Sequence, residues 1–200
     1  MTKVGRPVVM TAEVRRKEIL NAAEKLFGEK GFEQVTMSEI AEAAGMSKKT
    51  LYVHFADKQE LFKSLVTSSY VWSDNVSVNM SDDPVQQLKE CLYGIANHVL
   101  SDRHIKLCRL VIVGQLGMED LSNTFYEAAI SIARNNLIDC IQRIPENQRR
   151  IQLSSEGLAD MLFGASINKS FIDSLFMKKT IDPKEIYALI DRSVDALFHA

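Results

Sequence analysis

Apolar residues recur at helical spacing along the whole chain, whereas the alternating pattern of a β-strand is not found in it. In the first segment, Ile19, Ala23 and Phe27 fall on one face of a helix that ends near Gly31. The pattern predicts nine helices and an all-α fold. The helices are expected at about 11–31, 36–45, 47–55, 58–75, 84–101, 103–116, 118–144, 155–178 and 183–199.

Helix-start signals support these boundaries. Thr36 and Glu39 form a T-x-x-E capping box, and Ser47 stands where the cap of the next helix is expected. Gly45 provides the turn between these two short helices. Further starts are marked by Asp57 with Glu60, by Asp83 with Pro84, and by Asp182 with Pro183 and Glu185.

A polar segment, SVNMSDDP, separates a small N-terminal part of the chain from a larger C-terminal part. We expect a flexible arm at 1–10, a first helical domain at 11–57, a connecting helix and linker at 58–80, and a second helical domain at 81–200.

Composition is that of an ordinary globular protein, with 46% hydrophobic and 25% charged residues in a chain of 200. The net charge of -2 argues against a nucleic-acid partner, but 11 Lys and Arg against 9 Asp and Glu make residues 1–63 mildly basic. No apolar run reaches the ~18–20 residues that cross a bilayer, and residues 1–10 lack the apolar core of a secretion signal, so we expect a cytoplasmic protein. Cys91, Cys108 and Cys140 are far apart in apolar patterns, so we expect core cysteines, with no metal and no cofactor.

The segment SKKTLYVHF, residues 47–55, collects hydrogen-bond donors on one short helix. Two short helices joined by a glycine turn and packed on a preceding helix make a helix-turn-helix, whose second helix enters the major groove of DNA. There Lys48, Lys49 and Thr50 would reach base edges, and the helix start capped by Ser47 would favour a phosphate. Taken singly, each is equally a solvated surface residue. The donors expected to hold the DNA backbone are Tyr52, His54 and Lys58.

ILNAAEKLFGEKGFEQVTMSEIAEAAGMSKKTLYVHFADKQELF, within about Arg15 to Leu65, resembles the DNA-binding domain of the TetR family of transcriptional regulators. The resemblance implies a homodimer that places the helix around residues 47–52 of each subunit in the major groove of one half of a palindromic operator. It also implies that a small-molecule effector in the C-terminal domain weakens this fit.

The family's contacts carry over to this sequence by position. The resemblance implies base or groove contacts at Lys48, Lys49 and Thr50, and phosphate contacts at Tyr52, His54, Lys58, Thr36 and Ser38. The chain departs from the family pattern twice. Lys49 replaces a residue that is often small and should shift base preference, and Val53 replaces one that is often bulky and gives up a contact.

The N-terminal arm contains TKVGRP, which places Lys3 and Arg6 beside Gly5 and Pro7. This composition fits either an arm in the adjacent minor groove or a disordered terminus.

LCRLVIVGQLGMEDLSNTFYEAAISIARNNL, residues 107–137, resembles the C-terminal domain of AefR-like and AcrR-like members of the family. A ligand cavity needs mostly apolar walls with a few polar groups. Arg109 lies on an apolar helix and needs a partner, either an acidic side chain or an anionic ligand. The candidate cavity residues are Tyr70, Trp72, Tyr93, His98, Arg109, Phe125, Tyr126 and Phe163.

The last two helices carry broad apolar faces, which in the family pack against their copies as a four-helix dimer interface. The alternative is that both helices only cover their own domain. The predicted interface residues are Leu158, Leu162, Ala165, Phe171, Leu175, Ile186, Leu189, Ile190, Val194 and Leu197.

The rival class is an enzyme built in a helical bundle, but the sequence contains no H-E-x-x-H, C-x-x-C, G-x-S-x-G or P-loop motif. We therefore predict a ligand-responsive DNA-binding regulator, a repressor rather than an activator or a regulator that acts through protein partners. Its expected partners are double-stranded DNA, a small-molecule effector and a second copy of the chain.

Overall fold

The computed structural model describes residues 11–69, 82–114, 122–123, 125–177 and 182–199. Its contacts divide the chain into two compact units, Met1–Leu65 and Val66–Ala200. The division falls inside the segment 58–80, to which the sequence assigns the connecting helix and linker. The arm at 1–10 lies outside the described residues, so its role stays a prediction.

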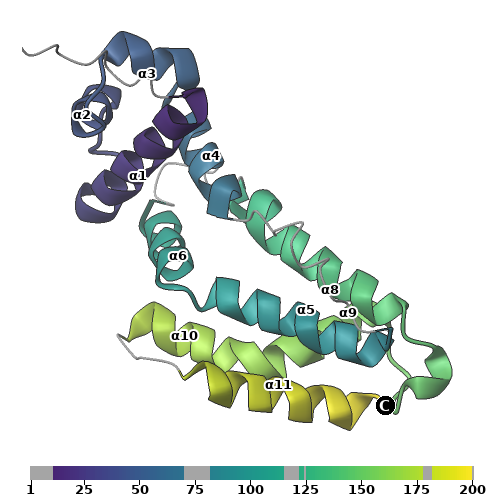
Figure 1. Ribbon diagram of the computed structural model, residues 1–200. Helices are drawn as coiled ribbons and strands as arrows, with labels where there is room; N and C mark the ends of the chain where they lie inside the picture. The colour runs from purple at the N-terminus through teal and green to yellow at the C-terminus, as the bar shows by residue number, and fades with distance from the viewer. Residues whose placement is uncertain (1–10, 70–81, 115–121, 124, 178–181, 200) are drawn as a thin grey trace, which may run out of the picture. The chain divides into compact units, whose positions relative to one another are not determined.

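The first unit contains α1 (Ala12–Lys30), α2 (Met37–Ala43), α3 (Lys48–His54) and the part of α4 (Lys58–Ser69) up to Leu65 (Figure 1). Three phenylalanines form the centre of its core: the ring of Phe32 lies 5.0 Å from that of Phe27 and 5.5 Å from that of Phe62. Leu51 of α3 is fully buried, so this core fixes α3 on the helices behind it.

The turn between α2 and α3 depends on Gly45, whose φ of +66° lies in the left-handed region. A side chain at this position would be strained, because only glycine adopts that conformation without cost. The turn lets α3 begin at Lys48 and leave the line of α2. The helix-turn-helix predicted from the sequence is therefore present.

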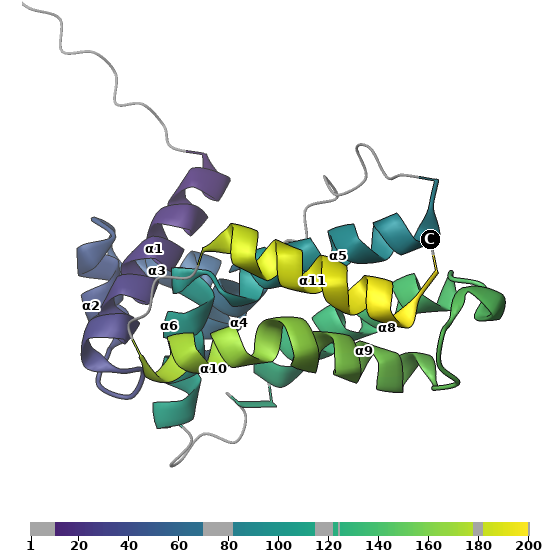
Figure 2. The same ribbon diagram turned by 90° about the horizontal axis from the view of Figure 1, so that it is seen from below.

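The second unit is a helical bundle. Figures 1 and 2 show α5 (Pro84–Val99), α8 (Ile132–Gln142) and α11 (Pro183–Leu197) running alongside the helical stretch formed by α9 (Ser155–Phe163), η4 (Gly164–Asn168) and α10 (Lys169–Phe176). α5 packs against both α8 and α11, which places its apolar face at the centre of the bundle. α6 (Asp102–Gly114) packs against α10, and a 3-10 turn, η3 (Glu146–Gln148), follows α8.

The all-α prediction is confirmed, and each of the nine predicted helices has a counterpart among the described residues. Two of them contain a π-helical turn that the pattern did not predict: η4 joins α9 to α10, and η2 (Tyr126–Ser131) leads into α8. The predicted extensions of α4 to residue 75 and of α8 back to residue 118 fall wholly or partly outside the described residues.

Candidate nucleic-acid interface and effector cavity

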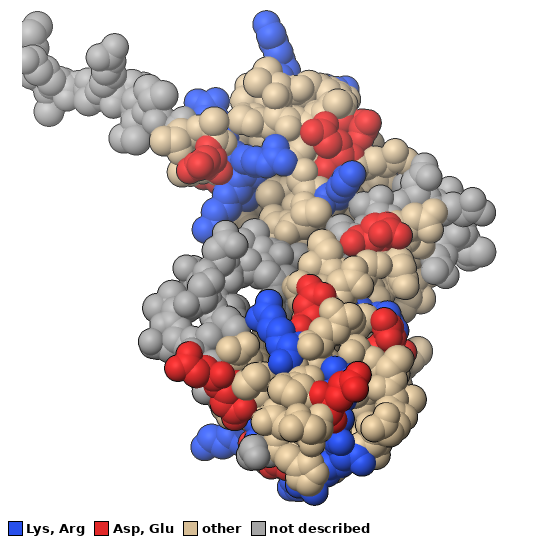
Figure 3. Space-filling model, turned by 90° about the vertical axis from the view of Figure 1, so that its right-hand side faces the viewer, with Lys and Arg blue, Asp and Glu red and all other residues tan. Residues whose placement is uncertain are grey.

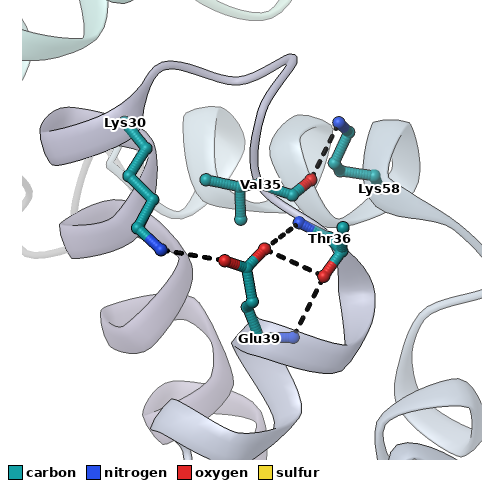
Figure 4. Close-up of polar contacts among 5 residues, drawn as sticks. All are labelled: Lys30, Val35, Thr36, Glu39 and Lys58. Atoms are coloured by element: carbon teal, nitrogen blue, oxygen red, sulfur yellow. Dashed lines mark hydrogen bonds and ion pairs between the residues drawn. The ribbon is translucent and has the colours of Figure 1, made fainter.

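The start of α2 is held by a complete capping box (Figure 4). The Thr36 hydroxyl accepts the Glu39 backbone N–H at 3.2 Å, while the Glu39 carboxylate accepts the Thr36 backbone N–H at 2.8 Å. Lys30 at the end of α1 donates to the same carboxylate at 2.8 Å. The Lys30 hydrogen bond, followed by the Thr36 backbone N–H, lowers the pKa of Glu39 to about 2.

Two residues of this region were predicted to contact phosphates. The Thr36 hydroxyl also donates to Glu39 at 2.9 Å, so its proton is already used in the capping box. Ser38 lies exposed on the first turn of α2, and its hydroxyl makes no hydrogen bond with the described residues. The geometry therefore favours Ser38 over Thr36 as a donor to a ligand.

The start of α3 is arranged differently. Its cap is formed by neighbouring residues of the same segment, and its charged side chains face solvent. The Ser47 side chain accepts the Thr50 backbone N–H at 3.1 Å and pairs with the Thr50 hydroxyl at 2.8 Å. Lys48 and Lys49 are exposed on the first turn, which contains no acidic residue. These two ammonium groups are therefore available to an anionic partner.

The outer face of α3 continues with Tyr52 and Val53, which are 46% and 77% exposed. An exposed valine on a helix surface costs free energy, because its apolar side chain remains in contact with water. The Lys48 ammonium lies 5.9 Å from the Tyr52 ring centre, which places charge, aromatic ring and hydroxyl on one surface. This surface, defined by Lys48, Lys49, Tyr52 and Val53, is hereafter the α3 face.

The end of α3 is braced by a residue that the sequence pattern did not reveal. The Arg16 guanidinium donates to the His54 carbonyl at 3.3 Å and to the Ser64 hydroxyl at 2.8 Å, and it lies 4.4 Å from the Phe55 ring centre. Arg16 thus fixes α3 from α1. Its position on the polar side of an amphipathic helix gave no signal of this role. The His54 side chain is half-buried at this end of α3.

Lys58, predicted to hold a phosphate, has a different role in this structure. Its ammonium donates to the carbonyls of Phe32, Glu33 and Val35 at 2.7, 3.1 and 3.0 Å; Figure 4 shows the last of these bonds. An ammonium has three protons, and here each has a backbone acceptor. Lys58 therefore braces the loop before α2 rather than offering a donor to DNA.

Charges of both signs are interspersed on the face of the molecule drawn in Figure 3. The charge density on that face is therefore mixed rather than uniformly basic. Attraction to a polyanion then depends on a few well-placed cations, of which Lys48 and Lys49 are the ones that α3 presents.

The second unit contains a cavity of about 470 Å³ between its helices. Apolar side chains from α5, α8 and α9 make most of its wall, and His104, Cys108 and Asn168 add polar atoms. Burial lowers the pKa of His104 to about 4 and raises that of Cys108 to about 12, so both groups are uncharged at neutral pH. The lining residues are Ile95, Val99, His104, Cys108, Phe125, Ile130, Ala133, Arg134, Leu137, Ala159, Asp160, Phe163, Gly164, Asn168 and Phe171.

Two charged residues belong to the described part of the cavity wall, and they neutralise each other. The Arg134 guanidinium donates from Nε and Nη2 to the two carboxylate oxygens of Asp160, at 3.0 and 3.1 Å. A bidentate pair leaves little net charge for a ligand. The described wall therefore suits an apolar ligand with a few neutral hydrogen-bonding groups.

Of the eight predicted cavity residues, Phe125 and Phe163 line the cavity. Tyr93 instead donates to Asp191 and packs against the tilted ring of Tyr187, with ring centres 4.5 Å apart. His98 contacts the His104 ring without lining the cavity, and Tyr126 is 51% exposed. Tyr70 and Trp72 lie outside the described residues.

Among the described residues, the partners of Arg109 are backbone carbonyls, which the sequence did not suggest. Its guanidinium donates to the carbonyls of Leu175 and Ser174 at 2.9 and 2.7 Å. These are among the last carbonyls of α10, which have no acceptor role within their own helix. The charge therefore caps a helix end, and this replaces the acidic side chain that the sequence suggested as a partner.

The predicted dimer face is corrected in part. Leu158, Leu162, Ile190 and Val194 are fully buried in the chain's own core, and Ile186 is 4% exposed, so these five present no surface. Phe171 lines the cavity. Leu175, Leu189 and Leu197 are half-buried, and Ala165 is exposed.

A shallow groove of about 270 Å³ runs between α9–η4 and α11 on the outer side of the bundle. Met161, which is 45% exposed, and Ala165 contribute one wall, and Ala196 and Leu197 contribute the other. Arg192 and Ser193 add polar atoms. We refer to this groove as the α9–α11 groove.

Among the described residues, no three His, Cys, Asp or Glu side chains gather as metal ligands would. None of the described helices combines the length and hydropathy that a bilayer crossing requires.

The segment that contains the α3 face matches a known protein family. Residues 19–65 match the family described as "Bacterial regulatory proteins, tetR family". The regulator TtgR of Pseudomonas putida is 32% identical over 95 residues, a match that covers 46% of this chain and 45% of TtgR. The chain thus matches about half the length of that curated relative.

Solved structures match over almost the whole chain. A TetR-family transcriptional regulator from Mesorhizobium loti superposes with a TM-score of 0.73 and 25% identity, covering 94% of this chain and 96% of that one. NalD of Pseudomonas aeruginosa, the secondary repressor of the MexAB-OprM multidrug efflux pump, superposes with a TM-score of 0.71 and 20% identity, covering 94% and 98%.

The protein is therefore a helix-turn-helix protein of the bacterial regulator class. Residues 19–65 belong to the TetR family of bacterial regulatory proteins, and over almost its whole length the chain resembles TetR-family transcriptional regulators, which are not enzymes.

Proposed function

We propose that the protein is a repressor that binds a palindromic operator as a homodimer and leaves it when a small molecule occupies the second unit. The observation that carries the proposal is the α3 face, where two free ammonium groups, a phenol and an apolar side chain stand exposed on a helix fixed from behind. A recognition helix needs these properties to read base edges in the major groove.

Roles within the DNA interface are assigned by which donors are free. Lys48 and Lys49 are placed to read base edges, and Tyr52 and Ser38 to hold phosphates. Val53 gives up the contact of a bulkier residue, but its exposed methyl groups still offer an apolar contact to a thymine methyl. Thr36 and Lys58 support the interface from inside, because their donors are already used.

The effector site is the cavity of the second unit. Its volume fits a drug-sized molecule, and its described wall is apolar apart from neutral polar groups and a self-neutralised ion pair. We therefore expect an uncharged, largely apolar effector. NalD, which shares the fold, is a repressor of a multidrug efflux pump, and this supports repression as the sign of regulation.

A second copy of the chain is the proposed occupant of the α9–α11 groove. The groove offers small and apolar residues on two helices at the C-terminal end of the chain, which permits close helix approach. This position agrees with the family resemblance, in which the last two helices pair with their copies.

Coupling between effector and DNA would pass through α4, because this helix crosses the division between the two units. An effector acts only if it binds the DNA-incompetent arrangement more tightly. A tilt of α4 that changes the separation of the two recognition helices would lower affinity for half-sites roughly 34 Å apart. Equal separations in the effector-bound and operator-bound dimers would exclude this mechanism.

The alternatives are an activator and a regulator that acts through protein partners. Both alternatives have the same fold as the repressor. The activator differs from it in the effect on transcription, and the partner-binding regulator differs in what binds the α3 face. An activator would bind the same kind of operator and raise transcription from it. A partner-binding regulator would show no selected DNA sequence.

The decisive experiment is selection of randomised duplex DNA by the purified full-length protein at moderate salt, followed by sequencing. We expect a palindrome, and a reporter placed behind it should be silenced by the protein. A non-palindromic site would contradict the dimeric arrangement. Absence of enrichment from folded protein that native mass spectrometry shows to be ligand-free would contradict DNA binding.

A further inference from the structure

One helical turn, η4, belongs to the walls of both the effector cavity and the α9–α11 groove. It contributes Gly164 and Asn168 to the cavity and Ala165 to the groove. The two residues before it divide in the same way, because Phe163 lines the cavity and Leu162 lines the groove. The proposed sites of the effector and of the second copy therefore share this short stretch of helix.

η4 is a π-helical turn between two α-helices, α9 and α10, and Figure 2 shows this stretch running beside α11. In a π turn the backbone N–H groups donate to carbonyls five positions back instead of four, which makes the turn wider than that of an α-helix. Single π turns inside α-helices are rare and are frequent at functional sites. Here the regular helix is interrupted where its residues line both spaces.

Two buried residues anchor the turn. Ile167 is fully buried in the core of the second unit, and Ser166 is 2% exposed. The Ser166 hydroxyl donates to the Leu162 carbonyl at 2.6 Å, which in an α-helix is the acceptor for the backbone N–H of residue 166. This bond ties the turn to a residue of the groove wall, so we expect the two to move together.

The cavity side of the turn has free space. Apart from the chain neighbours of Gly164 and the backbone of its own helix, no heavy atom lies within 4 Å of the place that a Cβ atom there would take. The φ of Gly164 is -60°, an ordinary helical value, so the backbone does not require glycine at this position. A molecule that fills the cavity would therefore press on η4 rather than on a packed side chain.

We propose that an effector in the cavity displaces η4 toward the groove and thereby weakens the pairing of two copies there. The cavity and the groove have these occupants under the proposed function, on which this coupling rests. A closely packed interface tolerates little change of shape, so movement of one wall lowers its affinity. The effector then reaches the operator through the dimer as well as through α4.

A coupling between two binding events is reciprocal. If occupancy of the cavity weakens the dimer by a certain factor, dimerisation weakens effector binding by the same factor, and typical factors are about 5–150. The monomer should therefore bind a cavity ligand more tightly than the dimer does. Both effects can be measured on the protein without DNA.

The test measures the dimer dissociation constant of the full-length protein by analytical ultracentrifugation, with and without saturating Nile red. Nile red is an uncharged, largely apolar dye whose fluorescence reports its binding. We expect the dye to weaken the dimer at least ~5-fold and to bind the dilute monomer more tightly than the concentrated dimer by the same factor. A dimer that binds the dye with an unchanged dissociation constant would overturn the coupling alone. A protein that forms no dimer or binds no dye would contradict the proposed sites, and the coupling with them.

Ala133→Phe shows whether the dye acts from the cavity. Ala133 lines the cavity from α8, which contributes no described residue to the groove. A phenyl ring at this position takes up cavity space, so the variant should lose Nile red binding and, with it, the effect of the dye on the dimer. If the dye still weakened the dimer of Ala133→Phe, it would be competing at the groove, and the proposed coupling would be wrong.

Ser166→Ala tests the bond that anchors the turn. Without the hydroxyl, displacement should be absorbed within η4, and the variant should lose most of the weakening that Nile red causes. Ser174→Ala is the matched control, because Ser174 of α10 is also buried and its hydroxyl has no hydrogen-bond partner among the described residues. It should keep the full effect of the dye. Equal effects in the two variants would exclude transmission through the Ser166 bond.

Discussion

The two lysines that open α3 differ from Lys58 in how many of their protons are free. Lys48 and Lys49 are exposed to solvent, whereas the three protons of Lys58 are bound by backbone carbonyls of the loop before α2. Identical side chains within eleven positions therefore have opposite roles. A lysine can serve as a DNA contact only where its neighbourhood leaves it without acceptors.

Replacement of Lys49 should alter which operator bases are preferred. In Lys49→Ala the selected sequence should relax at one position of each half-site, with a loss of about 1–3 kcal/mol of discrimination there, because an ammonium that reads guanine acceptors is removed. The measurement is selection from randomised DNA, run in parallel with Lys184→Ala, which removes an exposed lysine from α11. An unchanged base preference in Lys49→Ala would exclude Lys49 from base readout.

Replacement of Lys58 should lower stability rather than the salt dependence of DNA binding. Lys58→Met keeps most of the side-chain length but leaves three carbonyls without this donor, at a cost of about 1–3 kcal/mol in the free energy of unfolding. Urea unfolding measures this loss, and Lys48→Met, an exposed substitution, should change stability by less than about 0.5 kcal/mol. Full stability of Lys58→Met together with a reduced salt slope would restore the phosphate role.

At the scale of the element, α2 shows how one carboxylate can fix a helix start. Glu39 accepts from Lys30 and from the backbone and hydroxyl of Thr36, and these contacts hold its pKa at about 2 in the folded protein. The ordinary value of 4.5 applies once the chain unfolds. The group therefore stabilises the fold fully above the unfolded value, and this contribution is lost as the pH falls from about 4.5 toward 2.

Glu39→Gln should consequently be less stable than the natural chain at neutral pH, and the difference should shrink as the pH falls through this window. Thermal unfolding between pH 7 and pH 3 measures it. Glu42→Gln on the same helix makes the same change of charge outside the capping box and should show a smaller pH-dependent difference. A stability difference between Glu39→Gln and the natural chain that stays constant with pH would contradict the assignment.

Element positions could be predicted from the sequence because helix starts and apolar spacing are local properties. Thr36 with Glu39, Ser47, and Asp182 with Pro183 all mark starts that the structure confirms. In contrast, the local sequence does not determine whether an apolar helix face is covered by the chain's own core or by a second copy. Ile190 and Val194 fit an interface as well as a core, and the packing of α5 and η4 on α11 shows that they are core.

Polar partners were equally hidden from the sequence. Arg109 needs a partner by elementary electrostatics, but its partners are carbonyls 65 and 66 positions away, which no side-chain pattern announces. The cavity wall could not be predicted from the sequence either, because His104, Cys108 and Asn168 meet only through the arrangement of separate helices. The DNA-binding candidates were easier to find, because the four residues of the α3 face all lie within one seven-residue helix.

At the scale of the whole molecule, the proposed repressor requires a dimer, because a palindrome is read by two copies of α3 held at a fixed separation. The α9–α11 groove is one apolar surface that the last two predicted helices leave exposed after their core residues are accounted for. Its small residues, Ala165 and Ala196, permit close approach of a second copy. Shape and composition thus favour self-association at this place.

A charge introduced into the groove tests this directly. Ala165→Arg places a guanidinium on an exposed position of η4, where the folded monomer tolerates it but a closely packed interface would bury it without a partner. We expect the dimer to weaken on the order of a hundredfold or more, since burying an unpaired charge costs several kcal/mol. Analytical ultracentrifugation over a range of concentrations measures this, and affinity for the selected palindrome should fall with it.

Ala43→Arg is the matched control, because it introduces the same charge at an exposed alanine of α2 in the first unit. Its dimer should be as tight as that of the natural chain, although its DNA affinity can change independently. If Ala165→Arg remained as tight a dimer as Ala43→Arg, the interface would lie elsewhere. The half-site spacing of the operator would then have to be set by another surface of the second unit.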